Sequence, residues 1–218
     1  MNFRTDQRST GPADKTFYPD TMTASSDLQT AAGQYTKYTL TAMAFHWLLA
    51  ILIIASFSFG LYMVELPFSP ARIKQYNWHK WAGITILSLS AARLLWRLTH
   101  RPPALSKATP DWQKKVSQAV HLMLYALFFA APLAGWAYSS AAGFPVVYLG
   151  LIPLPDLVSP NRELADVLKL VHRTLVYSLA ALVGLHVLAA LKHQLIDRDG
   201  LIDRINPFAH RATPFQKN

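Results

Sequence analysis

The sequence contains no cysteine and few charged side chains, and both features narrow the range of functions. Without cysteine among its 218 residues, the chain cannot form disulfides, iron–sulfur clusters, thiolate nucleophiles or Cys-based zinc sites. Any transition metal must therefore be held by His, Met, Asp or Glu. Charged residues make up only 15%, against about 25% in an average soluble domain. No early apolar run with a cleavage signature is present, so we expect no secretory signal peptide.

Long apolar runs dominate the rest of the chain, which is 52% hydrophobic. Four stretches approach or exceed the ~20 residues that cross a bilayer, and backbone groups in lipid must be paired internally, so these stretches should be helices. We predict an all-α membrane protein, a four-helix transmembrane bundle within residues 37–207, with spans at about 42–64, 81–98, 116–142 and 168–191. Residues 1–36 read as a disordered polar tail, and 208–218 as a short C-terminal tail. The apolar patch Val146–Leu154 is too short to span, and we expect it at the membrane surface.

The positions of the basic residues predict the orientation of the bundle. Fifteen of the 21 Lys and Arg residues lie in the N-terminal tail, in the second loop with its flanks, and in the C-terminal segment. The positive-inside rule then places both termini in the cytoplasm. A formal net charge of +9 would suggest nucleic acid in a soluble protein. In a membrane protein the location of the charges matters more, so we expect membrane lipid and no nucleic acid as a partner.

Four histidines in the apolar stretches form two predicted pairs. His172 and His186 lie 14 residues apart on one helix, so both rings leave the same side, ~21 Å apart along the axis. With the termini inside, depth in the membrane pairs His79 with His172 at the outer face. The same argument pairs His46 with His186 at the inner face. Two bis-imidazole sites result, and such ligation of a porphyrin iron blocks both axial positions and favours electron transfer.

Two alternative roles compete for these histidines, an interfacial anchor and a zinc ligand. A single histidine near a membrane interface is often only an amphipathic anchor. Two histidines on one helix that each match a histidine of another helix in membrane depth are less easily explained as anchors. Zinc is the main rival ligand, but structural zinc needs four ligands in one place, whereas these four divide into two pairs.

The chain resembles the bacterial cytochrome b561 family in an ordered set of short segments: Phe45-His46-Trp47-Leu48, Trp78-His79-Lys80-Trp81-Ala82-Gly83, Arg93-Leu94-Leu95-Trp96-Arg97, Val171-His172-Arg173-Thr174 and Gly184-Leu185-His186. Cytochrome b subunits of nickel–iron hydrogenases are more distant relatives. The resemblance covers about residues 37–207. It implies a four-helix cytochrome of the bacterial inner membrane with two b haems. Their ligands would match His46, His79, His172 and His186, and electrons would exchange with the quinone pool. The 36-residue N-terminal tail and the long third loop depart from the shortest members.

Further polar residues are candidates for secondary sites. His121 and His193, with Lys107 or Lys114, could bind a quinone headgroup near the inner haem, although both histidines could equally be interfacial anchors. Arg93 and Arg97 are candidates for pairing with haem propionates, and snorkelling to phospholipid is the alternative for one of them. Arg173, beside His172, could pair with a propionate of the outer haem instead of forming part of the outer basic surface. Gly83 and Gly184 would allow close approach of a macrocycle, or simply pack helices. The basic residues of the outer face would attract a small anion or dock an acidic protein: Arg72, Lys74, Lys80, Lys169 and Arg173.

Three functions follow from these features. The first is a di-haem electron carrier that exchanges electrons with ubiquinone. Its most concrete form is a superoxide:ubiquinone oxidoreductase, because some members of the resembled family oxidise superoxide on the outer side. The second is a cytochrome b anchor subunit of a larger dehydrogenase or hydrogenase. The third is a non-redox transporter or channel, which predicts a colourless purified protein.

Overall fold

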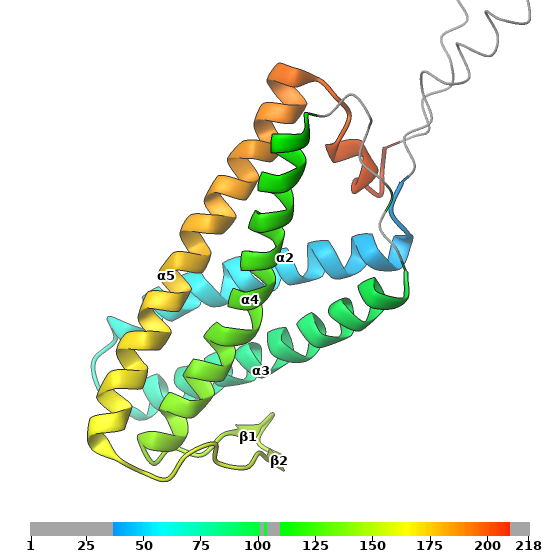
Figure 1. Ribbon diagram of the computed structural model, residues 1–218. Helices are drawn as coiled ribbons and strands as arrows, with labels where there is room; N and C mark the ends of the chain where they lie inside the picture. The colour runs from blue at the N-terminus through cyan, green and yellow to red at the C-terminus, as the bar shows by residue number, and fades with distance from the viewer. Residues whose placement is uncertain (1–36, 101–102, 104–109, 210–218) are drawn as a thin grey trace, which may run out of the picture. The chain divides into compact units, whose positions relative to one another are not determined.

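The computed structural model describes residues 37–100, 103 and 110–209. Four long helices form this part of the chain: α2 (Leu40–Val64), α3 (Pro70–Thr99), α4 (Asp111–Ala141) and α5 (Arg162–Lys192). A two-stranded antiparallel hairpin, β1 (Val147–Tyr148) and β2 (Ile152–Pro153), lies between α4 and α5. Figure 1 shows α4 and α5 side by side, with the hairpin near the turn that joins them. The tails at 1–36 and 210–218, which we expected to be disordered, lie outside the described residues.

Local sequence signals account for the starts of three of the helices. The side chains of Thr39, Ser69 and Asn161 each accept a hydrogen bond from the third backbone N–H that follows, which caps α2, α3 and α5. Pro70 follows Ser69 at the first position of α3, where proline needs no hydrogen-bond partner. The helix therefore starts eleven residues before the expected second span at 81–98, and residues 70–80 are helical rather than loop.

The helices pack as two antiparallel pairs that meet through α3 and α4. Contacts join α2 to α3, α3 to α4 and α4 to α5, and α2 also touches α5. We call the end with the α2–α3 and α4–α5 connections the hairpin end, and the opposite end the terminal end. Buried side chains at the centre come mainly from α4 and α5 and form one cluster, Leu124, Phe128 and Leu179.

Many apolar side chains on the helices are exposed instead of packed into this small core. Leu95 is 65% exposed, Leu122 71% and Leu188 64%, which would be unfavourable in water but is expected against lipid. Three helical segments are long and apolar enough to cross a membrane, namely Leu40–Val64, Asp111–Ala141 and Arg162–Asp197. The helix α3 is not among them because five cations lower its hydropathy: Arg72, Lys74, Lys80, Arg93 and Arg97. A membrane crossing by α3 therefore stays a prediction, as do the cytoplasmic termini.

The chain after α5 folds back over the terminal end. A π-helical turn (His193–Asp197) continues α5, and a 3-10 turn (Ile202–Arg204) follows. The indole Nε1 of Trp47 donates to the Ile205 carbonyl at 3.0 Å, and the backbone N–H of Tyr38 donates to the Arg204 carbonyl at 3.1 Å. These bonds fasten the C-terminal segment to the start of α2, close to where His46 leaves that helix.

Candidate functional site

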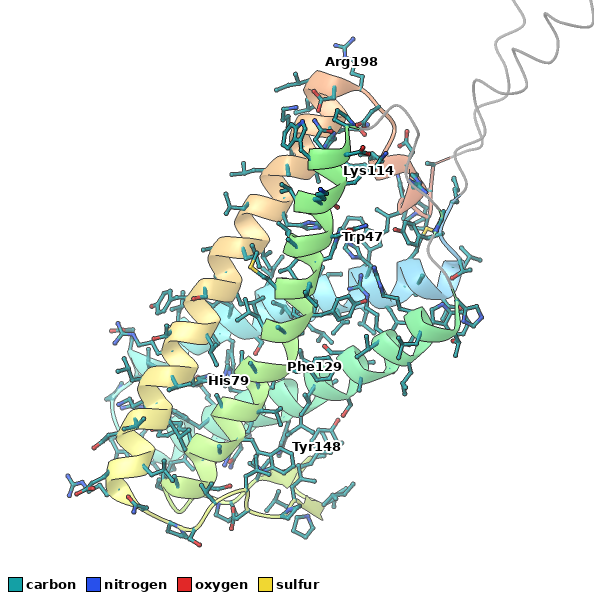
Figure 2. All side chains as sticks on the ribbon, viewed as in Figure 1. Trp47, His79, Lys114, Phe129, Tyr148 and Arg198 are labelled. Carbon is teal, nitrogen blue, oxygen red and sulfur yellow. The ribbon has the colours of Figure 1, made fainter. Side chains whose placement is uncertain are left out.

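The four histidines come together as two pairs at two levels of α5. The ring centres of His46 on α2 and His186 on α5 lie 6.4 Å apart. Those of His79 on α3 and His172 on α5 lie 6.3 Å apart. The first pair lies toward the terminal end and the second toward the hairpin end. The helix α5 thus contributes one imidazole to each pair. Figure 2 shows His79 within the helices, well away from Lys114 near the start of α4.

The spacing within each pair suits one iron between two imidazoles. Two first-row metal–imidazole bonds of about 2.0 Å each, extended to the ring centres, separate those centres by about 6.3 Å. Both observed separations lie within a tenth of an ångström or so of this value. Gly83 and Gly184, which we expected to allow close approach of a macrocycle, have open space where a side chain would stand. The donor set and this space fit a haem at each pair.

At the hairpin end, the ring of His172 is oriented by the backbone of α4. Its Nδ1 lies 2.9 Å from the Ala131 carbonyl oxygen, and since a carbonyl only accepts, Nδ1 carries the hydrogen. The lone pair of Nε2 is then free for a metal. The ring reaches this position because residue 135 is glycine: a Cβ there would lie 2.9 Å from Cε1 and 3.0 Å from Nδ1 of His172.

A matching arrangement surrounds His79. A Cβ built on Gly60 of α2 would lie 3.2 Å from Cε1 of His79, so this ring also lies in a glycine notch. Ser56 stands one helical turn before Gly60, as Ala131 stands one turn before Gly135. Nδ1 of His79 is buried without a hydrogen bond of good geometry in the described chain.

At the terminal end, an arginine side chain rather than a backbone carbonyl lies beside Nδ1 of His46. Nη2 of Arg93 lies 3.3 Å from Nδ1 of His46. A guanidinium only donates, so Nδ1 accepts and the hydrogen is on Nε2. Ligation through Nε2 therefore requires this contact to rearrange, which would release Arg93 for a propionate. The guanidinium groups of Arg93 and Arg97 both lie 5.6 Å from the ring centre of Tyr125. The third predicted propionate partner, Arg173, is exposed and lies over the ring of Tyr177 at 5.8 Å.

His121 joins the terminal-end pair as a third imidazole. Its ring centre lies 5.4 Å from that of His186, edge to face. It also lines a cavity of about 360 Å³ between α3 and α4. The polar groups in this lining are Arg97, Gln118, His121 and Tyr125, among apolar neighbours such as Phe129.

The other residues predicted to bind quinone lie elsewhere. Nδ1 of His193 is 2.6 Å from an Asp199 carboxylate oxygen and 3.1 Å from one of Asp197. These three side chains cluster closely enough to hold an ion, but Lys192 already pairs with Asp197 at 2.6 Å. Lys114 forms a salt bridge with Asp111 at 3.0 Å, and Lys107 lies outside the described residues. Of the three predicted residues that the structure describes, His121 faces the cavity and His193 and Lys114 do not.

Sequence reasoning missed several residues of these sites. Gly60 and Gly135 are costly inside helices, and that cost is a local hint that a neighbour needs the space. Gln118 and Tyr125 follow the helical spacing of His121, at one turn before and one turn after. They could have been named as its companions on the same face of α4.

The amino-acid sequence of the chain is similar to those of known proteins. The family model described as prokaryotic cytochrome b561 matches residues 37–207. The chain belongs to this family. It is 32% identical over 170 residues to cytochrome b561 homolog 2 of Escherichia coli K12, which covers 78% of this chain and 90% of the relative. It is 33% identical over 175 residues to the probable superoxide oxidase CybB of Yersinia pestis, over 78% and 96%. Cytochrome b561 homolog 1 of E. coli K12 is 33% identical over 129 residues, over 59% and 73%.

Family membership makes this prokaryotic cytochrome b561 a multi-pass bacterial membrane protein that binds haem b and transfers electrons. The two half-buried histidine pairs are the residues that could hold the haem.

Proposed function

We propose that the chain binds two b haems, one between His79 and His172 and one between His46 and His186, and exchanges electrons with the quinone pool of the inner membrane. The observation that carries this proposal is the pair of matching ring separations, 6.3 and 6.4 Å, at two levels of one helix. In this proposal all four helices cross the membrane, both termini are cytoplasmic, and the hairpin end faces outward.

The haem iron supplies reversible one-electron chemistry, and the protein sets the conditions for it. The two imidazoles of each pair would hold the iron of a bound haem, and ligation by two histidines would leave no open position for oxygen or other small ligands. The Ala131 carbonyl holds His172 in the tautomer that leaves Nε2 free. Arg93, which contacts His46, and Arg97, which lies with Arg93 beside the ring of Tyr125, would neutralise propionates by charge-assisted hydrogen bonds.

We infer a quinone site in the cavity between α3 and α4. A quinone headgroup has two carbonyl oxygens that need hydrogen-bond donors, and Arg97, Gln118, His121 and Tyr125 all offer N–H or O–H groups there. Apolar neighbours such as Phe129 suit the ring and the start of the isoprenoid tail. The 5.4 Å contact between His121 and His186 brings this cavity beside the terminal-end pair.

Superoxide is the electron donor that the relatives favour, because one of them is named a probable superoxide oxidase. Oxidation of two superoxide ions to two molecules of oxygen releases two electrons. Those electrons, with two protons from water, reduce one quinone to quinol. Cations gather at the hairpin end, and none of them forms a salt bridge within the described residues: Arg72, Lys74, Lys80, Lys169 and Arg173. Such a basic surface attracts a small anion.

The test is quinone reduction by the purified protein in lipid nanodiscs with superoxide as the only reductant. We expect one quinol for every two superoxide ions consumed, and no quinol when superoxide dismutase is added first. A protein that holds haem but forms no quinol under these conditions would favour the alternative function, an anchor cytochrome of a larger dehydrogenase or hydrogenase. A purified protein without haem would contradict both the electron-carrier function and the anchor function.

A further inference from the structure

The hairpin between α4 and α5 has one side fixed to α3. Nε1 of Trp81 donates to the Val147 carbonyl at 2.7 Å, and the hydroxyls of Thr85 and Tyr148 are hydrogen-bonded at 2.9 Å. Nζ of Lys80 donates to the Pro145 carbonyl at 3.2 Å. Figure 2 shows Tyr148 at the hairpin. These bonds hold β1 against the part of α3 that follows His79.

The other side of the hairpin is apolar and exposed. The exposed fraction is 66% for Phe144, 54% for Leu149, 81% for Leu151 and 55% for Ile152. No charged residue occurs from 143 to 155. An apolar patch of this kind on a monomer indicates a partner surface or lipid.

The turn of the hairpin carries strain at a large apolar residue. Leu149 has φ 53° and Gly150 has φ 74°. These are the two central residues of a β-turn inside the three-residue loop 149–151, which the N–H of Leu151 closes by donating to the Tyr148 carbonyl at 3.0 Å. A β-turn with positive φ at both central residues normally has Gly, Asn or Asp there, because a bulky side chain fits the left-handed region poorly. Such strain persists only where the surroundings compensate for it. Backbone hydrogen bonds from Gly150 to the Val147 carbonyl and from Leu151 to the Tyr148 carbonyl hold the turn. The turn therefore presents the side chain of Leu149, which is 54% exposed, away from the rest of the chain.

We propose that the tip of this hairpin, residues 149–152, inserts into the membrane at the boundary between headgroups and acyl chains. The hairpin adjoins α3 from Lys80 to Thr85, where the predicted span of that helix begins, so its apolar side continues the lipid-facing surface of the helices. Trp81 is an aromatic of the type that lies at this boundary. Only the tip can enter, because the unpaired edges of a two-stranded hairpin need water or headgroups.

The sequence around the tip sets the depth of insertion. Asp156, four residues after Ile152, is exposed and should remain in water. Insertion therefore predicts a steep change of environment between Ile152 and Asp156.

Because the chain has no cysteine, single nitroxide labels can measure this change in the full-length protein. Leu151→Cys and Ile152→Cys report on the tip, and Asp156→Cys is the matched control on the same connection. All three side chains are exposed, so labelling should leave the fold intact. The protein is placed in nanodiscs of phosphatidylcholine and phosphatidylglycerol. Collision rates with oxygen, which concentrates in lipid, and with a water-soluble nickel chelate are then compared.

We expect the labels at 151 and 152 to collide more with oxygen than with the nickel chelate, and the label at 156 to show the reverse. Equal nickel access at all three positions would place the hairpin in water and overturn the proposal. Protection of 151 and 152 from both reagents would show that protein, either a second copy or a partner, covers the tip, and would also overturn it. In detergent-free lipid the result does not depend on the number of haems or on quinone chemistry.

Discussion

Replacement of Gly135 by alanine should loosen the haem site at the hairpin end. The new Cβ would stand 2.9 Å from Cε1 of His172, whereas carbon atoms pack best at about 3.5–4.0 Å. The ring must therefore retreat by about 0.6 Å or more. That movement stretches the 2.9 Å bond from Nδ1 to the Ala131 carbonyl toward the limit of about 3.5 Å, where a hydrogen bond is lost.

The energetic consequence can be bounded from these contacts. Overpacking of this size costs about 1–3 kcal/mol, and the lost hydrogen bond adds about 0.5–1.5 kcal/mol. Alanine recovers up to about 1 kcal/mol of helix propensity. With the full helix propensity recovered, a net loss of about 0.5–3.5 kcal/mol corresponds to a fall in haem affinity of roughly 2- to 400-fold at this site.

The assay is haem titration into the apoprotein, followed by separate redox titration of the bound haems. Gly60→Ala is the graded comparison, because its Cβ would meet His79 at the longer distance of 3.2 Å and should have a smaller effect. If Gly135→Ala binds haem with unchanged stoichiometry, affinity and reduction potentials, then His172 does not depend on the glycine notch and the prediction is refuted.

Three further predictions concern the quinone cavity, the basic surface and the hairpin. His121→Ala should raise the apparent KM for quinone about 5- to 30-fold, because one hydrogen bond worth ~1–2 kcal/mol is lost. His193→Ala is the matched control and should leave this KM unchanged. Equal effects of the two substitutions would show that quinone does not bind in the cavity lined by His121. The rate of superoxide oxidation should fall as ionic strength rises, since the screening length drops from ~30 Å at 0.01 M to ~8 Å at 0.15 M, and a salt-independent rate would exclude steering. Trp81→Phe removes the hydrogen bond to Val147 and should speed amide hydrogen exchange across the hairpin; unchanged exchange would show that this bond does not hold it.

Much of the fold followed from the apolar runs, because a stretch without polar residues has few alternatives to a helix in lipid. The start of α3 did not follow from these runs, because its first turns are rich in polar residues and their low hydropathy predicts a loop. Ser69 and Pro70, a cap followed by proline, were the available signal. The hairpin turn was also missed, because leucine in a left-handed conformation has no sequence signature.

The functional site, like the fold, could be predicted from the sequence only in part. Pairing by depth needed only helix direction and spacing, and the structure brings those four rings together. The glycine notches depend on which neighbouring helix lies opposite each ring, and a single sequence does not contain that information. For His193, the carboxylates at Asp197 and Asp199 were visible four and six residues ahead. They could have indicated a local ion pair rather than a ligand-binding role.

The two-site assignment is tested most directly by the number of haems per chain, measured by pyridine haemochrome on the purified protein and on two variants. We expect two b haems in the unaltered chain. We expect one in His172→Ala and one in His186→Ala, with the remaining haem differing in reduction potential between the two variants. A single haem in the unaltered chain, or variants that both retain two, would contradict the claim that α5 serves two separate sites.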